Sequence, residues 1–296
     1  MSRGSVLCIG ETMGMIAPTD LEPFSQASTY RVEAGGAESN VAMRLATHGH
    51  VARWRSRLGD DALGHRVAES IAAAGVAVDV EWDSTRPTGL YLKDPGRGVT
   101  YYRSGSAASA ATPELLDDVD WSGVAIVHVT GITAALSDSC RALTYACLAR
   151  AHTEGVEVSF DVNHRAPLWE ERVAAEVLLD LARAADLVFV GRDEAEKLWD
   201  TATADDVRRL LPAARELVVK DGEVGATAWS GDVSAFVATP PVEVVEAVGA
   251  GDAFAAGYLS VRLRDGSDVA SPDQLAARLA FGHACAAAAL SSTADV

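Results

Sequence analysis

The sequence predicts an α/β protein in which helices cover both faces of a mostly parallel β-sheet. Short apolar runs typical of buried strands alternate along the chain with longer stretches of helical periodicity. Several helical stretches also end at a glycine, which is a common helix-termination signal. With 296 residues, of which 49% are hydrophobic, the chain is long enough to bury a substantial core.

The expected elements follow one another in a regular order. We expect strands at 5–10, 52–58, 125–131, 156–163, 186–190 and 216–222, and helices near 39–48, 137–154 and 170–184. A further helix carries Leu63, Val67 and Ile71 on one face and ends at Gly75.

Two segments break this alternation, at about 13–34 and about 86–104. Both alternate apolar and polar residues and contain glycine and proline, a pattern typical of hairpins. They form either surplus edge strands of the main sheet or a separate β-element. We favour a small β-lid on a single domain spanning 1–296, because such a lid excludes water from a reaction site.

Composition narrows the classes of function. The net charge of −17 argues against nucleic acid or an anionic membrane as a partner. Only three lysines occur, so a clamp for an anionic ligand is expected to use arginine. No segment is long and apolar enough for a membrane span or a secretory signal, so a cytoplasmic location is expected. Four scattered cysteines are expected to be buried and unpaired: Cys8, Cys140, Cys147 and Cys285.

The most informative stretch is VGAGDAFAAGY, at 248–258. Gly249, Ala250 and Gly251 precede Asp252, and a helical pattern begins directly afterwards. Small residues let the backbone turn sharply, and helix N-terminal amides favour an anion. A carboxylate there can accept a proton from a hydroxyl group, although Asp252 alone would also fit a simple helix cap. No glycine is followed by lysine, so a phosphate site here cannot use a GxxxxGK[ST] loop.

The chain resembles the ribokinase-like (PfkB) carbohydrate kinases. The late motif DTxGAGDxF is matched by Gly249, Ala250, Gly251, Asp252 and Phe254, and the early motif GGxxxNxA is matched by Gly35, Gly36, Asn40 and Ala42. A third stretch, RLGDDALG at 57–64, follows the early motif. The resemblance implies a three-layer α/β/α sandwich, with the glycine-rich turn as an anion hole and Asp252 as the catalytic base.

The resemblance also implies ATP and Mg²⁺ as cofactors. Glu194 matches a glutamate that organises magnesium-bound water, and Lys220, Gly222 and Gly225 match residues that border the nucleotide. His283 is placed with the nucleotide-binding residues, without a catalytic role. The family's usual Asp and Thr before the glycine turn are Glu246 and Ala247 here, which leaves activation by a monovalent cation open, and Gly191 replaces the usual Asn near Glu194.

Within this family the sequence is most similar to 2-keto-3-deoxygluconate kinases, through PTGLYLK (87–93), YYRSGSAAS (101–109) and DVNHRAPLW (161–169). The expected reaction is phosphorylation of the terminal hydroxyl, giving the 6-phosphate. A guanidinium pairs well with a sugar acid's carboxylate, and tyrosine rings suit the sugar carbons. The expected sugar-binding residues are Gly35, Gly36, Asn40, Tyr91, Tyr101, Arg103, Arg165 and Asp252, with Glu11 as a further acidic contact.

Two other functions remain open. One is a kinase for a neutral ketose such as fructose, another small sugar or a nucleoside, and the other is a non-catalytic sugar sensor on the same fold. An intact Asp252 argues against the sensor, because a pure binding protein needs no base. A β-lid exposes sheet edges, so a homo-oligomer, either a dimer or a larger assembly, is also expected.

Overall fold

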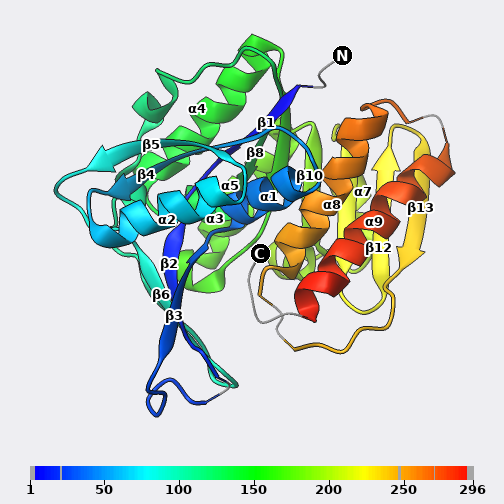
Figure 1. The fold of residues 1–296 in the computed structure, drawn as a ribbon. Helices are drawn as coiled ribbons and strands as arrows, with labels where there is room; N and C mark the ends of the chain where they lie inside the picture. Colours follow the sequence, from blue (N-terminus) through cyan, green and yellow to red (C-terminus); the bar gives the residue numbers. More distant parts are fainter. Residues whose placement is uncertain (1–3, 21, 246–247, 270, 292–296) are drawn as a thin grey trace.

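The computed structural model describes residues 4–20, 22–245, 248–269 and 271–291. Within these ranges, the largest sheet has nine strands in the order β13-β12-β11-β10-β9-β8-β1-β4-β5 (Figure 1). From β11 to β5 all neighbours are parallel, and only the pairs β11–β12 and β12–β13 are antiparallel, so β12 alone runs in the opposite direction. The strands are β1 (Ser5–Ile9), β4 (Ala52–Gly59), β5 (Ala77–Asp83), β8 (Val124–Thr130), β9 (Glu157–Asp161), β10 (Leu187–Gly191), β11 (Glu216–Asp221), β12 (Gly225–Ser230) and β13 (Val233–Ala238).

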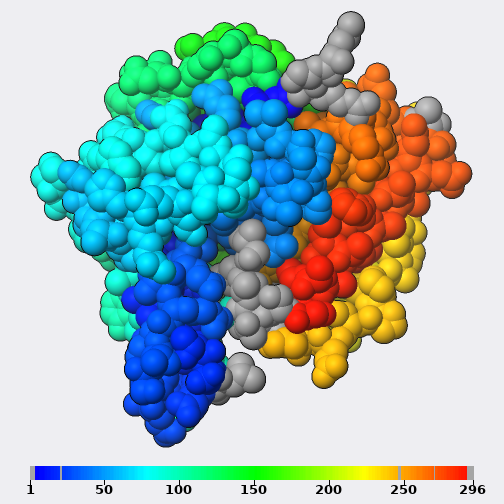
Figure 2. All heavy atoms as spheres, in the orientation of Figure 1, coloured from blue at the N-terminus to red at the C-terminus, as the bar shows by residue number. Residues whose placement is uncertain are grey.

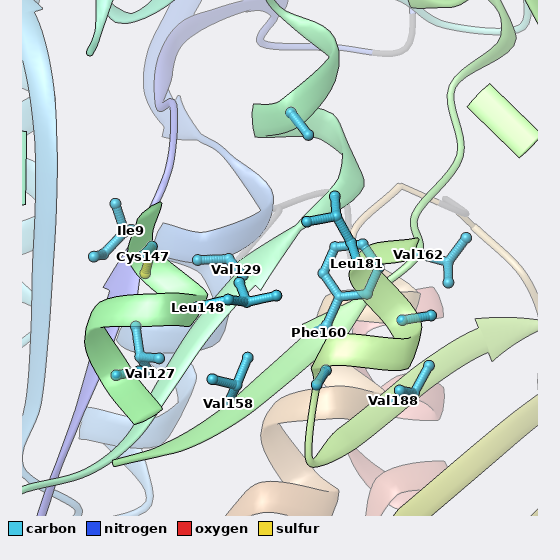
Figure 3. Close-up of a cluster of buried hydrophobic side chains, with 14 of the residues drawn as sticks. Ile9, Val127, Val129, Cys147, Leu148, Val158, Phe160, Val162, Leu181 and Val188 are labelled. Carbon is cyan, nitrogen blue, oxygen red and sulfur yellow. The ribbon is translucent and has the colours of Figure 1, made fainter. Parts of the chain in front are cut away.

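Helices cover both faces of this sheet. One face packs against α1 (Ala37–Thr47), α2 (Ala62–Ala73), α8 (Ala250–Asp265) and α9 (Pro272–Leu290). The other packs against α3 (Gly131–Ala135), α4 (Asp138–Glu154), α5 (Glu171–Ala184), α6 (Arg192–Trp199) and α7 (Ala204–Leu210). Alternate strand residues supply the two cores: Val6 and Cys8 face one layer, whereas Leu7 and Ile9 face the other. Figure 3 shows Ile9 within the second of these cores. The predicted three-layer α/β/α class is confirmed.

A second, four-stranded sheet, called the small sheet from here on, projects from the body of the molecule (Figures 1 and 2). Its order is β3-β2-β6-β7, with β2 (Met13–Pro18), β3 (Tyr30–Gly35), β6 (Leu90–Asp94) and β7 (Gly98–Tyr102). These strands fall within the two segments expected to form hairpins, and they are not edge strands of the main sheet. Met13, Met15 and Tyr91 form their own buried cluster.

Local signals account for several element boundaries. Ser137 caps α4 by accepting a hydrogen bond from the amide of Cys140, and Gly155 ends it in the left-handed region at φ 70°. Strand β9 ends at Asp161, earlier than expected, and Asn163 adopts φ 38° two residues later. Three single 3₁₀ turns complete the assignment: Ala108–Ala110, Pro113–Leu116 and Ala166–Leu168.

Two expectations from composition are met in the described ranges. All four cysteines are buried and unpaired. None of the helices in these ranges has the length and apolar character that a membrane crossing requires.

Candidate active site

The start of α8 lies between the carboxyl ends of β9, β10 and β11 and the small sheet. Gly249 caps this helix in the left-handed conformation, with φ 81°, which a residue with a side chain adopts only at a cost. The amides of the first turn are directed out of the helix N-terminus, where the helix dipole adds positive potential. Asp252 lies within this turn and is 9% exposed.

Asp252 is held by a contact from the early motif. Asn40 of α1 donates a hydrogen bond from Nδ2 to Asp252 Oδ2 at 2.9 Å, which joins residues 212 positions apart in the chain. The pKa of Asp252 is raised to about 6, chiefly by burial and also by the charge of Asp161, although the Asn40 hydrogen bond and the charges of Arg165 and Lys220 act to lower it. Asp252 is therefore ionised at neutral pH with a pKa close to it, which suits a general base.

A charged cluster lies beside Asp252 at the carboxyl ends of β9, β10 and β11. Lys220 donates from Nζ to Asp161 Oδ2 at 2.8 Å. Burial lowers the pKa of Lys220, but the charges of Asp161 and Glu194 outweigh it, so the net pKa is raised and the ammonium stays protonated. Such a buried cation suits the negative oxygens of a phosphate.

Glu194 is tied to the same edge of the sheet by two main-chain amides. Its Oε1 accepts from the amide of His164 and its Oε2 from the amide of Gly191, both at 2.8 Å. Burial raises the pKa of Glu194, and this effect outweighs the opposing charge of Lys220. Gly191, which stands where the family has Asn, thus holds Glu194 through its backbone.

Two adjoining clefts meet at Asp252. The α8 cleft, with a volume of about 500 Å³, is lined by Asp161, Asn163, Gly191, Asp193, Glu194, Lys220, Gly222 and Gly251. The small-sheet cleft, of about 410 Å³, is lined by Glu11, Met13, Gly35, Gly36, Ala37, Asn40, Tyr91, Arg103, Ser104, Ile132, Pro167 and Leu168. Both are also lined by Tyr101, Arg165, Val248, Gly249 and Asp252. One cleft is rich in charged groups and the other in tyrosine and glycine, so they suit two chemically different ligands.

The two arginines expected to meet a sugar carboxylate differ in their surroundings. Arg103 donates from Nε to Glu11 Oε2 at 2.7 Å, and one of its terminal nitrogens contacts the same oxygen. Ser106 donates to the other Glu11 oxygen at 2.8 Å, so the Glu11 carboxylate is fully engaged. The guanidinium of Arg165, in contrast, makes no hydrogen bond or ion pair within the described ranges, and the residue lies exposed at the junction of the clefts. Both arginines line the small-sheet cleft, as expected, but they differ in charge balance, because Arg103 already carries a buried counter-ion.

The tyrosines form one wall of the small-sheet cleft. The rings of Tyr91 and Tyr101 lie 5.6 Å apart between centroids, and Arg103 lies 5.6 Å from the Tyr101 ring. Tyr91 is buried, whereas Tyr101 is 50% exposed. A Cβ on Gly35 would lie 2.0 Å from the Tyr91 hydroxyl oxygen, so only glycine leaves room for this ring.

Three predicted site residues lie away from the clefts. His283 pairs through Nε2 with the carbonyl oxygen of Val237 at 3.1 Å and packs edge-on against Phe254. Gly225 packs against the Val237 carbonyl, where a Cβ would come within 2.5 Å. Both residues serve the packing of α9 and β13, and neither reaches a cleft. Ala250 is the first residue of α8 and lines neither cleft, while Glu246 and Ala247 lie outside the described residues.

The sequence analysis missed Asp161 and Asn163 as site residues. The signal was their position at the end of a predicted buried strand, because ligands bind at the carboxyl ends of strands in open α/β sheets.

The donor set fits a nucleotide phosphate with a magnesium ion. Lys220 and the α8 N-terminus suit the phosphate oxygens, and a Cβ on Gly251 would lie 3.7 Å from Lys220 Nζ, so Gly251 faces this cation. Carboxylates of Asp161, Asp193 and Glu194 line the same cleft. No group of three or more His, Cys, Asp or Glu in the described part of the chain is arranged to hold a metal by itself. Magnesium commonly uses one or two carboxylates together with phosphates and water.

Comparisons with known proteins identify the family and the fold. A family model described as pfkB family carbohydrate kinase matches residues 3–295. The chain is 35% identical over 263 residues to a 2-dehydro-3-deoxygluconokinase from Bacillus subtilis, covering 85% of this chain and 81% of that one. Its fold is similar to a PfkB protein from Polaromonas sp. JS666, with a TM-score of 0.85, 30% identity and coverage of 98% and 97%. It is also similar to a fructokinase with bound ATP from Xylella fastidiosa, with a TM-score of 0.87, 28% identity and coverage of 100% and 94%.

Proposed function

The chain belongs to the pfkB family of carbohydrate kinases and is therefore a sugar kinase, and from this premise we propose its substrate and its catalytic residues. The proposed reaction transfers the γ-phosphoryl group of ATP to the terminal hydroxyl of a sugar acid. The proposed acceptor is 2-keto-3-deoxygluconate, also called 2-dehydro-3-deoxygluconate, and the product is its 6-phosphate.

The observation that carries this proposal is the position of Asp252, shared by two clefts of different chemistry. A kinase must bring a phosphate donor and a hydroxyl acceptor to one point from two sides. The α8 cleft, with Lys220 and the α8 N-terminus, suits the polyphosphate. The small-sheet cleft, with Tyr91, Tyr101 and Asn40, suits the sugar.

Asp252 then acts as the base. It removes the proton of the terminal hydroxyl, the resulting oxygen forms a bond to the γ-phosphorus, and the bond from that phosphorus to the β–γ bridging oxygen breaks to release ADP. The Asn40 hydrogen bond keeps the carboxylate in place, and the amides around Gly249 and Gly251 face the charge on the transferring group. Magnesium, bound with ATP, neutralises phosphate charge, and we propose that Glu194 contacts it through water.

The preference for an acid rests on Arg165. It is a cation without a carboxylate partner in the described ranges, and it lies beside the reaction point. A planar guanidinium of this kind pairs with a carboxylate through two parallel hydrogen bonds. Arg103 lines the same cleft, but its charge is largely balanced by Glu11.

The test is a panel of sugar acids and neutral ketoses with MgATP, in which ADP release is coupled to NADH oxidation. We expect kcat/KM for 2-keto-3-deoxygluconate to exceed that for fructose by at least about tenfold, the size of one good charge-assisted contact. An equal or higher value for fructose would remove the sugar-acid assignment and leave the sugar kinase.

The alternatives give distinct results in the same panel. A neutral-ketose kinase, for which the solved fructokinase fold is an argument, would release ADP with fructose and not with acids. A non-catalytic sensor would show thermal stabilisation by a sugar without ADP release.

We also infer a homo-oligomer, because the small sheet ends in strands β3 and β7, which have no further strand partner in the described ranges. Tyr102 on β7 is 58% exposed, which adds apolar area at that edge. Light scattering coupled to size-exclusion chromatography measures the mass directly, and a mass of one chain at micromolar concentration would contradict the inference.

A further inference from the structure

The carboxyl group of Glu38 is buried behind the active site, although it takes no part in the reaction proposed above. Glu38 lies in the first turn of α1 and is 1% exposed. Its Oε1 accepts hydrogen bonds from the amide and hydroxyl of Thr130, at 3.1 and 2.8 Å, and from the hydroxyl of Thr133 at 2.8 Å. The second oxygen, Oε2, is buried and has no hydrogen-bond partner in the described part of the chain.

This contact fastens α1 to a different part of the sheet. Thr130 ends β8 and Thr133 lies in α3, so Glu38 links the early motif to the β8–α3 junction. A Cβ on Gly10 would lie 2.1 Å from the Glu38 carboxyl carbon, so the carboxyl packs directly on the backbone after β1. A helix-dipole interaction alone does not explain these contacts, because an exposed glutamate in the first turn would serve that purpose.

These hydrogen bonds to Glu38, called the Glu38 tether from here on, matter because α1 begins without a side-chain cap. The N-cap residue is Gly36, which has no side chain to accept an amide hydrogen bond. Tertiary contacts therefore fix the first turn: Ser39 donates to the Gly36 carbonyl, Thr12 donates to Ser39, and Glu38 reaches Thr130. Asn40, which holds Asp252, lies only two residues after Glu38 in this same turn.

We propose that Glu38 is a positioning residue for phosphoryl transfer, whose carboxylate fixes the first turn of α1 so that Asn40 remains hydrogen-bonded to Asp252. This inference rests on the proposed function, in which Asp252 is the base. Burying a carboxyl group with one oxygen unpaired is costly, and the contacts of Oε1 only partly compensate. A cost of this kind is expected where it secures the geometry of a site.

The charged groups around these carboxyls set the background for a pH test. The charge of Glu38 raises the pKa of Cys8 of β1, and the charge of Asp252 of α8 raises the pKa of Glu38. From β8 the titratable side chain is His128, where burial lowers the pKa to about 4 and the ring is neutral. Asp161, Lys220 and Arg165 act on Asp252. Burial raises the pKa of Glu38 itself to about 7, so this carboxyl group titrates in the same pH range as Asp252, and Glu38→Gln removes that titration while keeping an acceptor. The charge of Asp252 is the last of the causes of this shift, so direct charge coupling between the two is minor.

The test uses two substitutions of Glu38 that differ in what they retain. Glu38→Ala removes the tether, so Asn40 loses its position, and the pKa of Asp252 rises by about one unit, as expected for loss of a hydrogen bond to a charged group. The acid limb, meaning the fall of kcat on the acid side of its pH profile, then moves its midpoint from about pH 6 towards 7. This shift lowers turnover about fivefold at pH 6 and little at pH 8. Glu38→Gln keeps an acceptor for the threonines, and its acid limb stays in place.

Two controls make the result specific. Leu148→Ala, in the core on the opposite face of the sheet, lowers thermal stability without moving the acid limb. In an Asn40→Ala background, Glu38→Ala shifts the limb no further, because the bond through which it acts is already absent. If Glu38→Ala does not fold, Thr133→Val removes one of the three donors and gives a smaller shift in the same direction.

A readout that needs no turnover separates this inference from the proposed function. In protein labelled with ¹³C-aspartate, the Asp252 carboxyl signal is assigned by its loss in Asp252→Asn, and its pH titration is followed directly. A wild-type protein that phosphorylates no sugar refutes the proposed function, while this titration still tests Glu38. An Asp252 titration unchanged in Glu38→Ala, or a further shift in the Asn40→Ala background, overturns the positioning role.

Discussion

Replacing Arg165 by Ala should separate sugar acids from neutral sugars. Arg165 follows strand β9, lies exposed at the junction of the two clefts, and makes no ion pair in the described ranges. Replacing its side chain by that of alanine breaks no hydrogen bond or ion pair of the guanidinium within the described ranges. The substitution should therefore change recognition of the substrate with little effect on the free energy of unfolding.

The magnitude follows from the contact that is lost. A hydrogen bond to a charged group contributes about 1.5–3 kcal/mol, so kcat/KM for 2-keto-3-deoxygluconate should fall by about 10- to 150-fold. Fructose has no carboxylate, and its kcat/KM should change by less than about threefold. Arg165 also lowers the pKa of Asp252, which affects every substrate near pH 6. Assays at pH 8, where Asp252 is ionised in both proteins, remove this second effect.

Arg103→Ala is the matched comparison, because Arg103 lines the same cleft but is paired. Its removal leaves the Glu11 carboxylate, 3% exposed, without its cation. Breaking one partner from a buried pair costs about 3–5 kcal/mol of stability. This variant should therefore unfold at lower temperature and lose turnover on acids and neutral sugars alike.

The assay couples ADP release to NADH oxidation over a range of each sugar, and differential scanning fluorimetry follows stability. Equal losses on fructose and 2-keto-3-deoxygluconate for Arg165→Ala at pH 8 would refute the reasoning. So would an unchanged kcat/KM for the acid.

Five further outcomes are expected. Asp252→Asn should lower kcat by about 10²- to 10⁴-fold while sugar binding measured by calorimetry stays near wild type; a kcat within about threefold of wild type would exclude a base at this position. Below about pH 6, kcat of the wild type should fall tenfold per pH unit as Asp252 takes up its proton, and a flat profile to pH 5 would contradict this. Because its folded-state pKa is raised from 3.8, Asp252 favours folding at low pH and loses that contribution as pH rises through about 6. At pH 8, Asp252→Asn should therefore increase the free energy of unfolding by up to about 3 kcal/mol, and the unfolding temperature should rise with it. Gly35→Ala should displace Tyr91 and raise KM for the sugar with KM for ATP unchanged. Arg278 and Arg262 both pair with the buried carboxylate of Glu216, and Arg278→Met, which removes one of these two cations, should cost about 3 kcal/mol in denaturant unfolding with KM values unchanged.

Strong local patterns made the layered architecture predictable. Apolar runs such as 186–190 have few alternatives to a buried strand, and Ser137 and Gly155 mark the ends of α4 with their own capping chemistry. Strands β5, β12 and β13 were not predicted. Strands β5 and β13 are partly exposed at the two edges of the sheet, so their hydrophobic signal is weak, and pairing with a neighbour decides their structure. Strand β12 lies inside the sheet, between β11 and β13.

The candidate site was predictable where a motif is contiguous and unpredictable where it depends on partners. The turn at Gly249 and the helix that begins after it, with Asp252 in its first turn, follow from local sequence. The pairing of Arg103 with Glu11 does not, because nothing in either segment reveals that residues 92 positions apart share a buried contact. His283 shows the reverse case: it lies near a motif in sequence, but its ring is committed to the Val237 carbonyl.

The sequence by itself determined the alternation of strands and helices, the left-handed glycine before α8 and the carboxylate after it, because these depend on neighbours within a few residues. The tertiary structure alone decided which groups meet: Asn40 with Asp252, Glu38 with Thr130, and Arg165 with no partner in the described ranges. Charge balance and burial arise from contacts between distant segments. They decide which arginine is available to a ligand and which carboxylate has a pKa near neutrality, so they require the folded chain.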